Sequence, residues 1–212
     1  MTVKLDTADT DAPPDRYPAL TVALHWTSAF AVTTAFALAW ARAAIDDTQP
    51  RAALMQVHEA AGLFVLALLL LRVGARIAQW SSRPRHDLPR PLALAAFGGH
   101  LLLYALLLAM PLLGWALANA HGHDVRLPGL AVFPTLVGTD PDLADTLESW
   151  HVGVSWVLLS VVALHVAAAM FHHLVRRDGV LGSMLPARAR APIPVSARRG
   201  GGAPRPQGSR SF

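Results

Sequence analysis

The fold is decided by residues 146–175, which read TLESWHVGVSWVLLSVVALHVAAAMFHHLV. The stretch is long and apolar enough to cross a membrane, because a spanning helix needs about 20 mostly apolar residues. Two histidines, His151 and His165, interrupt it. Their separation is close to four helical turns, so both rings leave one helix face about 21 Å apart along the axis. An ionisable side chain in lipid is costly, so this pair indicates function rather than packing.

Three further segments have the length and hydropathy of membrane spans, at about residues 18–41, 53–78 and 92–120. Within lipid only helices and closed barrels satisfy their backbone groups, and these segments lack the alternation of barrel strands. Hydrophobic residues make up 53% of the 212-residue chain and charged residues only 15%, against about 25% charged residues in soluble domains. We therefore predict an all-α fold, an integral membrane four-helix bundle.

The composition also excludes several classes of site. The chain has no cysteine, which rules out disulfides, thiolate metal sites, iron–sulfur clusters and covalently attached c-type haem. The formal net charge of +4 comes from arginines gathered near the ends of the spans. That pattern is typical of membrane topology and not of nucleic-acid binding, and a basic tail on anionic lipid is the nearest alternative.

The arginines also predict the orientation, because short cytoplasmic connections are enriched in Lys and Arg. The connection between the second and third spans and the tail after residue 176 are rich in arginine, whereas the third connection has one arginine against four aspartates. We expect residues 121–145 outside the cell and both termini in the cytoplasm. Residues 1–16 and 179–212 are interpreted as cytoplasmic tails, the second basic and disordered, flanking a four-span domain at 17–178.

This orientation sets the depth of each histidine. His25 lies about two turns into the first span from the inner side, and His58 lies near the outer end of the second. Depth therefore pairs His58 with His151 outside and His25 with His165 inside. Two opposed neutral imidazoles at one level are a ligand set for a low-spin b-type haem, whereas zinc prefers three or four protein ligands. Two such levels predict two haems.

Alternatives remain open on geometry alone. His100 lies at a depth similar to that of His165, and His172 follows two turns later on the same face, so either could replace an inner ligand. Each histidine could instead only hydrogen-bond between helices. Arg72 lies on the face of His58 and Arg76 one turn further, where both could pair with haem propionates or only follow the positive-inside rule.

The chain resembles the bacterial cytochrome b561 family across about residues 17–186. The resemblance rests on eight pieces in order: Leu24-His25-Trp26, Val57-His58 with Gly62, Arg72-x-x-x-Arg76, Gly99-His100, Pro111-x-x-Gly114, Ser149-Trp150-His151, Leu164-His165 and His172-His173. It implies four transmembrane helices in the bacterial inner membrane and two b haems. By family pattern the ligands match His25, His58, His151 and His165, on the first, second and fourth spans, and exclude His100.

Within the family, the chain is most similar to the free-standing superoxide oxidase branch. That similarity implies electron transfer from superoxide to ubiquinone, with membrane lipid and quinone as further partners. Glu148 stands where the branch implies a basic residue, which lowers the expected attraction for superoxide. The same fold implies an alternative, a cytochrome subunit that carries electrons between a hydrogenase or dehydrogenase partner and quinone. A cofactor-free membrane scaffold or transporter is the third alternative. The quinone site is expected near Trp150 and the third connection, or near His172.

Overall fold

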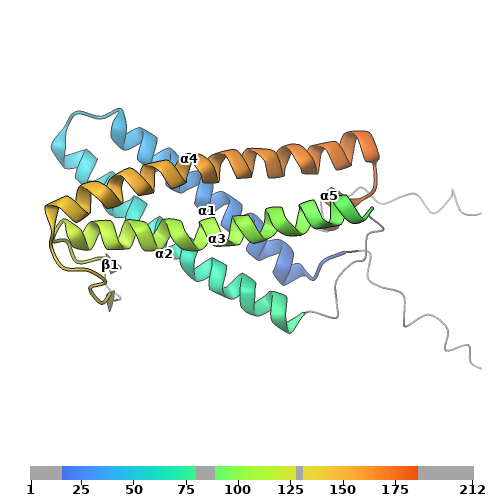
Figure 1. Cartoon of the computed structure of the whole chain (residues 1–212), viewed down its shortest axis with the longest axis horizontal. Helices are drawn as coiled ribbons and strands as arrows, with labels where there is room; N and C mark the ends of the chain where they lie inside the picture. Colours follow the sequence, from blue (N-terminus) through green and yellow to red (C-terminus); the bar gives the residue numbers. More distant parts are fainter. Residues whose placement is uncertain (1–15, 80–88, 128–130, 186–212) are drawn as a thin grey trace, which may run out of the picture.

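The computed structural model describes residues 16–79, 89–127 and 131–185, and its architecture is the predicted bundle of four long helices (Figure 1). The helices are α1 (Ala19–Ala43), α2 (Thr48–Ala78), α3 (Arg90–Ala120) and α4 (Pro141–Phe171). All four are long and apolar enough to cross a membrane. Large apolar side chains stand on the outside of the bundle, such as Phe30, Ile77 and Leu164, each at least 70% exposed. A surface of this kind is suited to lipid.

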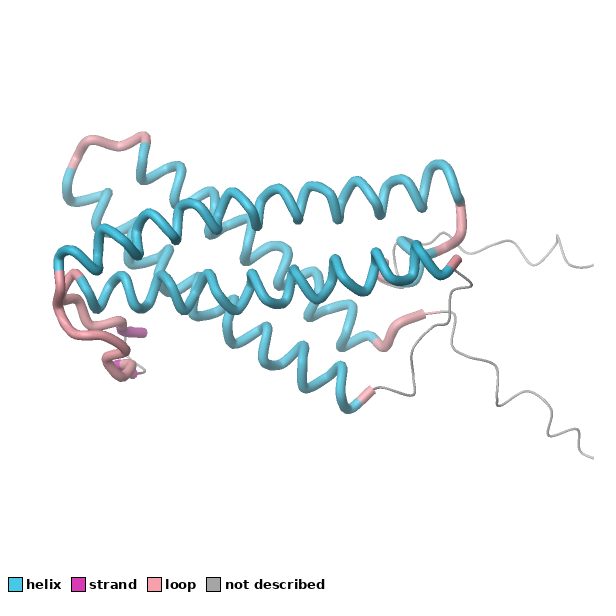
Figure 2. The backbone as a smooth tube through the Cα atoms, in the orientation of Figure 1, coloured by secondary structure: helices cyan, strands magenta, loops and turns pink. Residues whose placement is uncertain are grey.

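The helices run up and down, so the α1–α2 and α3–α4 connections lie at one end (Figure 2). We call this end outer, following the predicted orientation, and the opposite end inner. α1 packs mainly along α2 and α3 mainly along α4, with α2 and α3 joining the two halves. Among the described residues, α1 and α4 have few if any close backbone approaches. The two halves therefore leave room between α1 and α4.

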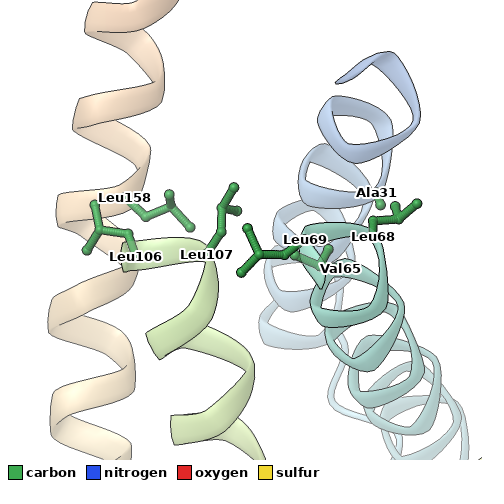
Figure 3. Close-up of a cluster of buried hydrophobic side chains, with 7 residues drawn as sticks. All are labelled: Ala31, Val65, Leu68, Leu69, Leu106, Leu107 and Leu158. Carbon is green, nitrogen blue, oxygen red and sulfur yellow. The ribbon is translucent and has the colours of Figure 1, made fainter. Parts of the chain in front are cut away.

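Buried apolar side chains from all four helices form the core at mid-depth (Figure 3). They are Ala31, Val65, Leu68, Leu69, Leu106, Leu107 and Leu158. Leu158 follows His151 by two turns and precedes His165 by two turns, so the core lies between the two histidine levels. Burying these side chains stabilises the bundle and places a largely apolar layer between its two ends.

The ends of the helices explain where the predicted spans differ from the observed ones. α2 and α4 each begin five residues before the predicted start, because their first turns are polar and do not read as membrane. Asp140 caps α4: its Oδ1 accepts hydrogen bonds from the backbone N–H groups of Asp142 and Leu143, at 3.0 and 3.1 Å. A capping side chain satisfies backbone donors that a helix start leaves free.

Short elements complete the two ends. At the outer end, β1 (Arg126–Leu127) pairs antiparallel with β2 (Ala131–Val132) inside the third connection. At the inner end, α4 continues as a π-helical turn, η1 (His172–Arg176), and Arg177 follows with a left-handed φ of 53°. The short helix α5 (Val180–Ser183) then packs back towards α1, since the Tyr17 N–H donates to the carbonyl of Ser183. Of the two predicted tails, residues 1–15 and 186–212 lie outside the described residues.

Candidate functional site

The outer level brings together the two histidines that depth had paired. His58 projects from α2 and His151 from α4, and the centres of their rings are 6.3 Å apart with planes inclined at 75°. Both side chains are half-buried. The residues are almost a hundred positions apart in the chain, so only the antiparallel packing of the bundle makes them neighbours.

The surroundings of this pair hold the two rings in place. The His58 Nδ1–H donates to the carbonyl of Ala35 on α1 at 2.9 Å, which leaves Nε2 free to bind a metal. The His151 ring lies against α3 at Gly114, where an added Cβ would come within 3.2 Å of the ring carbon Cε1. Gly114 therefore provides the space that the His151 ring occupies. The Nδ1 of His151 is buried and has no hydrogen-bond partner among the described residues.

The inner level has the same spacing between its two predicted ligands. His25 on α1 and His165 on α4 have ring centres 6.3 Å apart, with planes inclined at 55°. Trp26 meets the edge of the His25 ring at 5.4 Å between centres. Its indole N–H donates to the carbonyl of Met184 at 2.8 Å, which ties this end of α1 to the residues after α5. His25 and His165 thus bridge the two halves of the bundle.

His100 comes to the same level but sits in a different setting. Its ring centre is 5.4 Å from that of His165. Unlike His25 and His165, which are half-buried, His100 is exposed, and its Nδ1 donates to the carbonyl of Ala96, one turn back on its own helix, at 2.6 Å. His172, the other alternative, lies near the end of the fourth span and donates to Asp178, just beyond it, at 2.5 Å. The 5.4 Å spacing between His100 and His165 differs from the 6.3 Å that the two pairs share.

Arg72 lies with the inner histidines. Its guanidinium carbon is 5.5 Å from the centre of the Tyr104 ring, a cation–π distance. It is also within electrostatic range of His25, His100 and His165. Arg76, one turn further, is within electrostatic range of His100. The inner level therefore carries a cluster of positive charge, although Arg72 shares a helix face with the outer ligand His58.

Both histidine pairs fit a b-type haem. Two imidazoles on opposite sides of one metal ion, with metal–nitrogen bonds of about 2.0–2.1 Å, have ring centres roughly 6–6.5 Å apart. Both pairs have that spacing. A Cβ added at Gly62, Gly99 or Gly153 would meet nothing within 4 Å, as would one at Gly74 or Gly98, so the helix surfaces at these glycines are open. Among the described residues, no group of three or more His, Cys, Asp or Glu side chains could hold a metal ion, which disfavours zinc.

Two features of the outer end escaped the sequence analysis. The third connection is folded against the bundle: buried Asn119 donates to the carbonyl of His123 at 3.0 Å and accepts from the Leu136 N–H at 2.8 Å. An asparagine beside a run of apolar residues was the available signal. The second feature is Arg42, near the end of α1, whose buried Nε has no hydrogen-bond partner among the described residues. Its position near a helix end gives no sign in the sequence that it would be buried.

A charged clasp closes the inner end. Asp178 accepts hydrogen bonds from His172 and, at 3.2 Å, from Arg176, and its other oxygen accepts from the Val180 N–H at 3.3 Å. Burial alone would raise the pKa of Asp178, but the hydrogen bond from His172 and then the others outweigh it and hold the pKa below its ordinary value. The clasp positions α5 under the inner histidines.

Comparison with known proteins identifies the family. A family model described as prokaryotic cytochrome b561 matches residues 16–187. A probable superoxide oxidase CybB of Yersinia pestis is 28% identical over 175 residues, covering 81% of this chain and 96% of that protein. Cytochrome b561 homolog 2 of Escherichia coli K12 is 28% identical over 175 residues, covering 81% and 92%. Cytochrome b561 homolog 1 of the same organism is 29% identical over 177 residues, covering 82% and 99%.

The family match covers most of the chain, including all four helices and both histidine levels. The chain therefore belongs to the prokaryotic cytochrome b561 family, as a bacterial membrane protein that binds b-type haem and takes part in transmembrane electron transfer.

Proposed function

We propose that this protein is a superoxide:ubiquinone oxidoreductase that holds two b haems, one between His58 and His151 and one between His25 and His165. The observation that carries the proposal is the repeated spacing of 6.3 Å between ring centres at two levels of one bundle. The similarity to a protein named as a probable superoxide oxidase supports the choice of substrate.

When bound, each haem would accept and release one electron at a time. His58 and His151 would hold one haem and His25 and His165 the other, which would leave neither metal ion a coordination position for oxygen or superoxide. His58 is oriented by the carbonyl of Ala35, and His151 by the space at Gly114. Two superoxide anions release two electrons and become two O₂ molecules. One ubiquinone takes up both electrons with two protons and becomes ubiquinol, which balances the reaction.

The core supports transfer between the two levels. Apolar side chains around Leu107 and Leu158 fill the middle of the bundle. Electrons can tunnel through such a layer, whereas protons and ions need polar groups or water. The four-span unit, residues 17–178 in this proposal, is thus suited to moving electrons without leaking ions.

Rapid mixing tests the reaction. The purified protein, oxidised and with its haem content measured, is mixed with superoxide in the presence and absence of ubiquinone. We expect fast haem reduction that needs His58, and ubiquinol formation when quinone is added. Haem reduction no faster than in a His58→Ala variant would contradict the proposal. That result would favour the alternative, a cytochrome subunit of a larger enzyme. Glu148, an exposed acidic residue at the outer end, would fit that alternative as part of a surface that binds a partner protein.

The proposal also requires the outer level to face away from the cytoplasm, in the bacterial inner membrane. The chain has no cysteine, so single cysteines can report the orientation. In intact cells, an impermeant thiol reagent should label Thr135→Cys in the third connection. It should leave Ser82→Cys, in the second connection outside the described residues, unlabelled until the cells are opened. The reverse pattern would invert the topology.

A further inference from the structure

Among the described residues, no carboxylate forms a salt bridge with Arg42. Among the described residues, only two buried side-chain polar atoms lack a hydrogen-bond partner, the Nε of Arg42 and the Nδ1 of His151, and both belong to the outer end. A guanidinium nitrogen shielded from water and without an acceptor is unfavourable. The presence of such a guanidinium nitrogen therefore indicates that a bound ligand supplies the hydrogen-bond acceptor.

The backbone of α1 places Arg42 on the side that faces the outer pair. The carbonyl of Ala35 accepts the hydrogen bond from His58, and Arg42 follows Ala35 by seven residues, close to two turns, on the same helix face. Helical side chains lean towards the N-terminus of their helix, so Arg42 reaches from the outer end back towards the level of His58. It lies within electrostatic range of His58.

The described part of the protein offers no anion for this guanidinium. Its salt bridges join Asp124 to Arg126, and Asp178 to His172 and Arg176, and none of them includes Arg42. Asp46 and Asp47 follow α1 closely, yet both are exposed and make no salt bridge with it. The missing acceptor is therefore expected from a bound molecule at the outer pair.

We propose that Arg42 binds a carboxylate of the haem held by His58 and His151, and so is the anchor of the outer haem. The inference rests on the proposed function in one respect, that the outer pair binds haem. A guanidinium matches a carboxylate with two parallel hydrogen bonds, which a lysine cannot reproduce. This positive charge also favours the reduced state of the haem, because reduction adds one negative charge beside it.

The test compares Arg42→Gln with Arg126→Gln in the holoprotein. Arg126 is a matched control at the same end, since its side chain is 64% exposed and paired with Asp124. Transfer of haem to apomyoglobin measures haem loss, and a redox titration measures each haem. We expect Arg42→Gln to lose the outer haem about tenfold faster and to shift its reduction equilibrium about tenfold towards the oxidised state, which is about 59 mV for one electron. The inner haem should not change.

Two further measurements identify the acceptor. Reconstitution with haem whose propionates are esterified should abolish the difference in haem loss between the wild type and Arg42→Gln. Arg42→Lys, which keeps the charge but not the paired hydrogen bonds, should lose haem faster with a smaller shift in potential. If Arg42→Gln does not fold, wild-type haem retention in Arg42→Lys would by itself overturn the proposal.

The remaining outcomes separate this inference from the proposed function. Equal behaviour of Arg42→Gln and Arg126→Gln would overturn the role of Arg42. The role of Arg42 would also be overturned if Arg42→Gln kept normal haem retention and midpoint potential but reacted with superoxide more slowly and with less dependence on salt. Arg42 would then attract the substrate and not anchor the haem. A wild-type protein with only the inner haem would instead refute the two-haem proposal itself.

Discussion

The outer and inner histidine levels share a spacing but differ in their surroundings. The outer pair lies between the backbone of α1 and the glycine surface of α3, beneath a folded connection pinned by Asn119. The inner pair has a third histidine, His100, beside it and Arg72 within electrostatic range of all three rings. The chain thus repeats the spacing of the imidazoles and varies the charge around them.

This difference in charge predicts which of the two haems has the higher midpoint potential. Positive charge stabilises the reduced form of a nearby haem, and its effect is strong where water is absent. Arg72 and Arg76 lie near the inner rings, whereas Arg42 is the arginine near His58. We expect the inner haem to have the higher midpoint potential, so an electron that enters at the outer side moves downhill to the inner level. The following predictions test this contrast.

The largest effect is expected from removing a ligand. His58→Ala or His151→Ala should abolish the outer haem and keep the inner one, while His25→Ala or His165→Ala should do the reverse. A pyridine haemochrome assay with a protein determination measures haem per chain. His100→Ala is the control and should keep both haems, because His100 is exposed and its 5.4 Å spacing from His165 differs from the 6.3 Å of the two pairs. If His58→Ala and His165→Ala remove the same haem, the pairing is wrong.

A smaller effect should follow from crowding the outer pair. In Gly114→Val the new side chain would press on the His151 ring, since a Cβ alone comes within 3.2 Å. Overpacking typically costs about 1–3 kcal/mol, which is roughly 5- to 150-fold in haem affinity. The outer haem signal in electron paramagnetic resonance should shift or weaken, and the inner signal should persist. Gly98→Ala, at an exposed position with open space, should change neither signal.

A third variant addresses the charge contrast. Arg72→Gln removes the cation that acts on His25, His100 and His165. Its inner haem should shift about tenfold towards the oxidised state, about 59 mV in midpoint potential, with the outer haem unchanged. A spectroelectrochemical titration resolves the two steps. Arg90→Gln, at the exposed start of α3, is the control. An outer haem that shifts more than the inner one would show that Arg72 serves the outer level.

The smallest effect concerns the clasp below the inner pair. Asp178→Asn weakens the hydrogen bonds from His172 and Arg176, so α5 should detach more often. Labelling of a cysteine placed at Ser183, a position only 3% exposed, should then speed up several-fold. Asp142→Asn at the outer end should leave it unchanged.

The clasp also has a pH dependence with a definite sign. The pKa of Asp178 is lowered, so its contribution is complete above the ordinary carboxyl pKa and is lost as pH falls through the lowered value. Labelling of the same cysteine with a dipyridyl disulfide, which reacts with thiols even in acid, should rise only under strongly acidic conditions. A rise near neutral pH would contradict this assignment.

The sequence predicted the span interiors and the two histidine levels because both follow from helical periodicity and hydropathy. It could not separate His100 from His165 by depth, since the difference lies in exposure and in a hydrogen bond to Ala96. It also did not single out Arg42, because the burial of its Nε without a hydrogen-bond partner among the described residues is visible only when α1 and α2 are packed together. The α5 segment lies within residues interpreted as a tail, and a run of four residues is too short to show helical periodicity.

In a membrane, the two histidine levels would lie at different depths in the transmembrane electric field, one on each side of the apolar core. His151 and His165 are about 21 Å apart along α4, roughly two-thirds of a hydrocarbon core about 30 Å thick. Moving one charge across a whole membrane changes its energy by about 2.3 kcal/mol per 100 mV, so an electron passing between the levels would experience roughly 1.5 kcal/mol per 100 mV. In a cell that is negative inside, the membrane potential opposes an electron that moves inward, whereas the expected difference in haem midpoint potential favours that movement. The rate of the reaction would then report the energised state of the membrane, falling as the potential builds up and rising when it collapses.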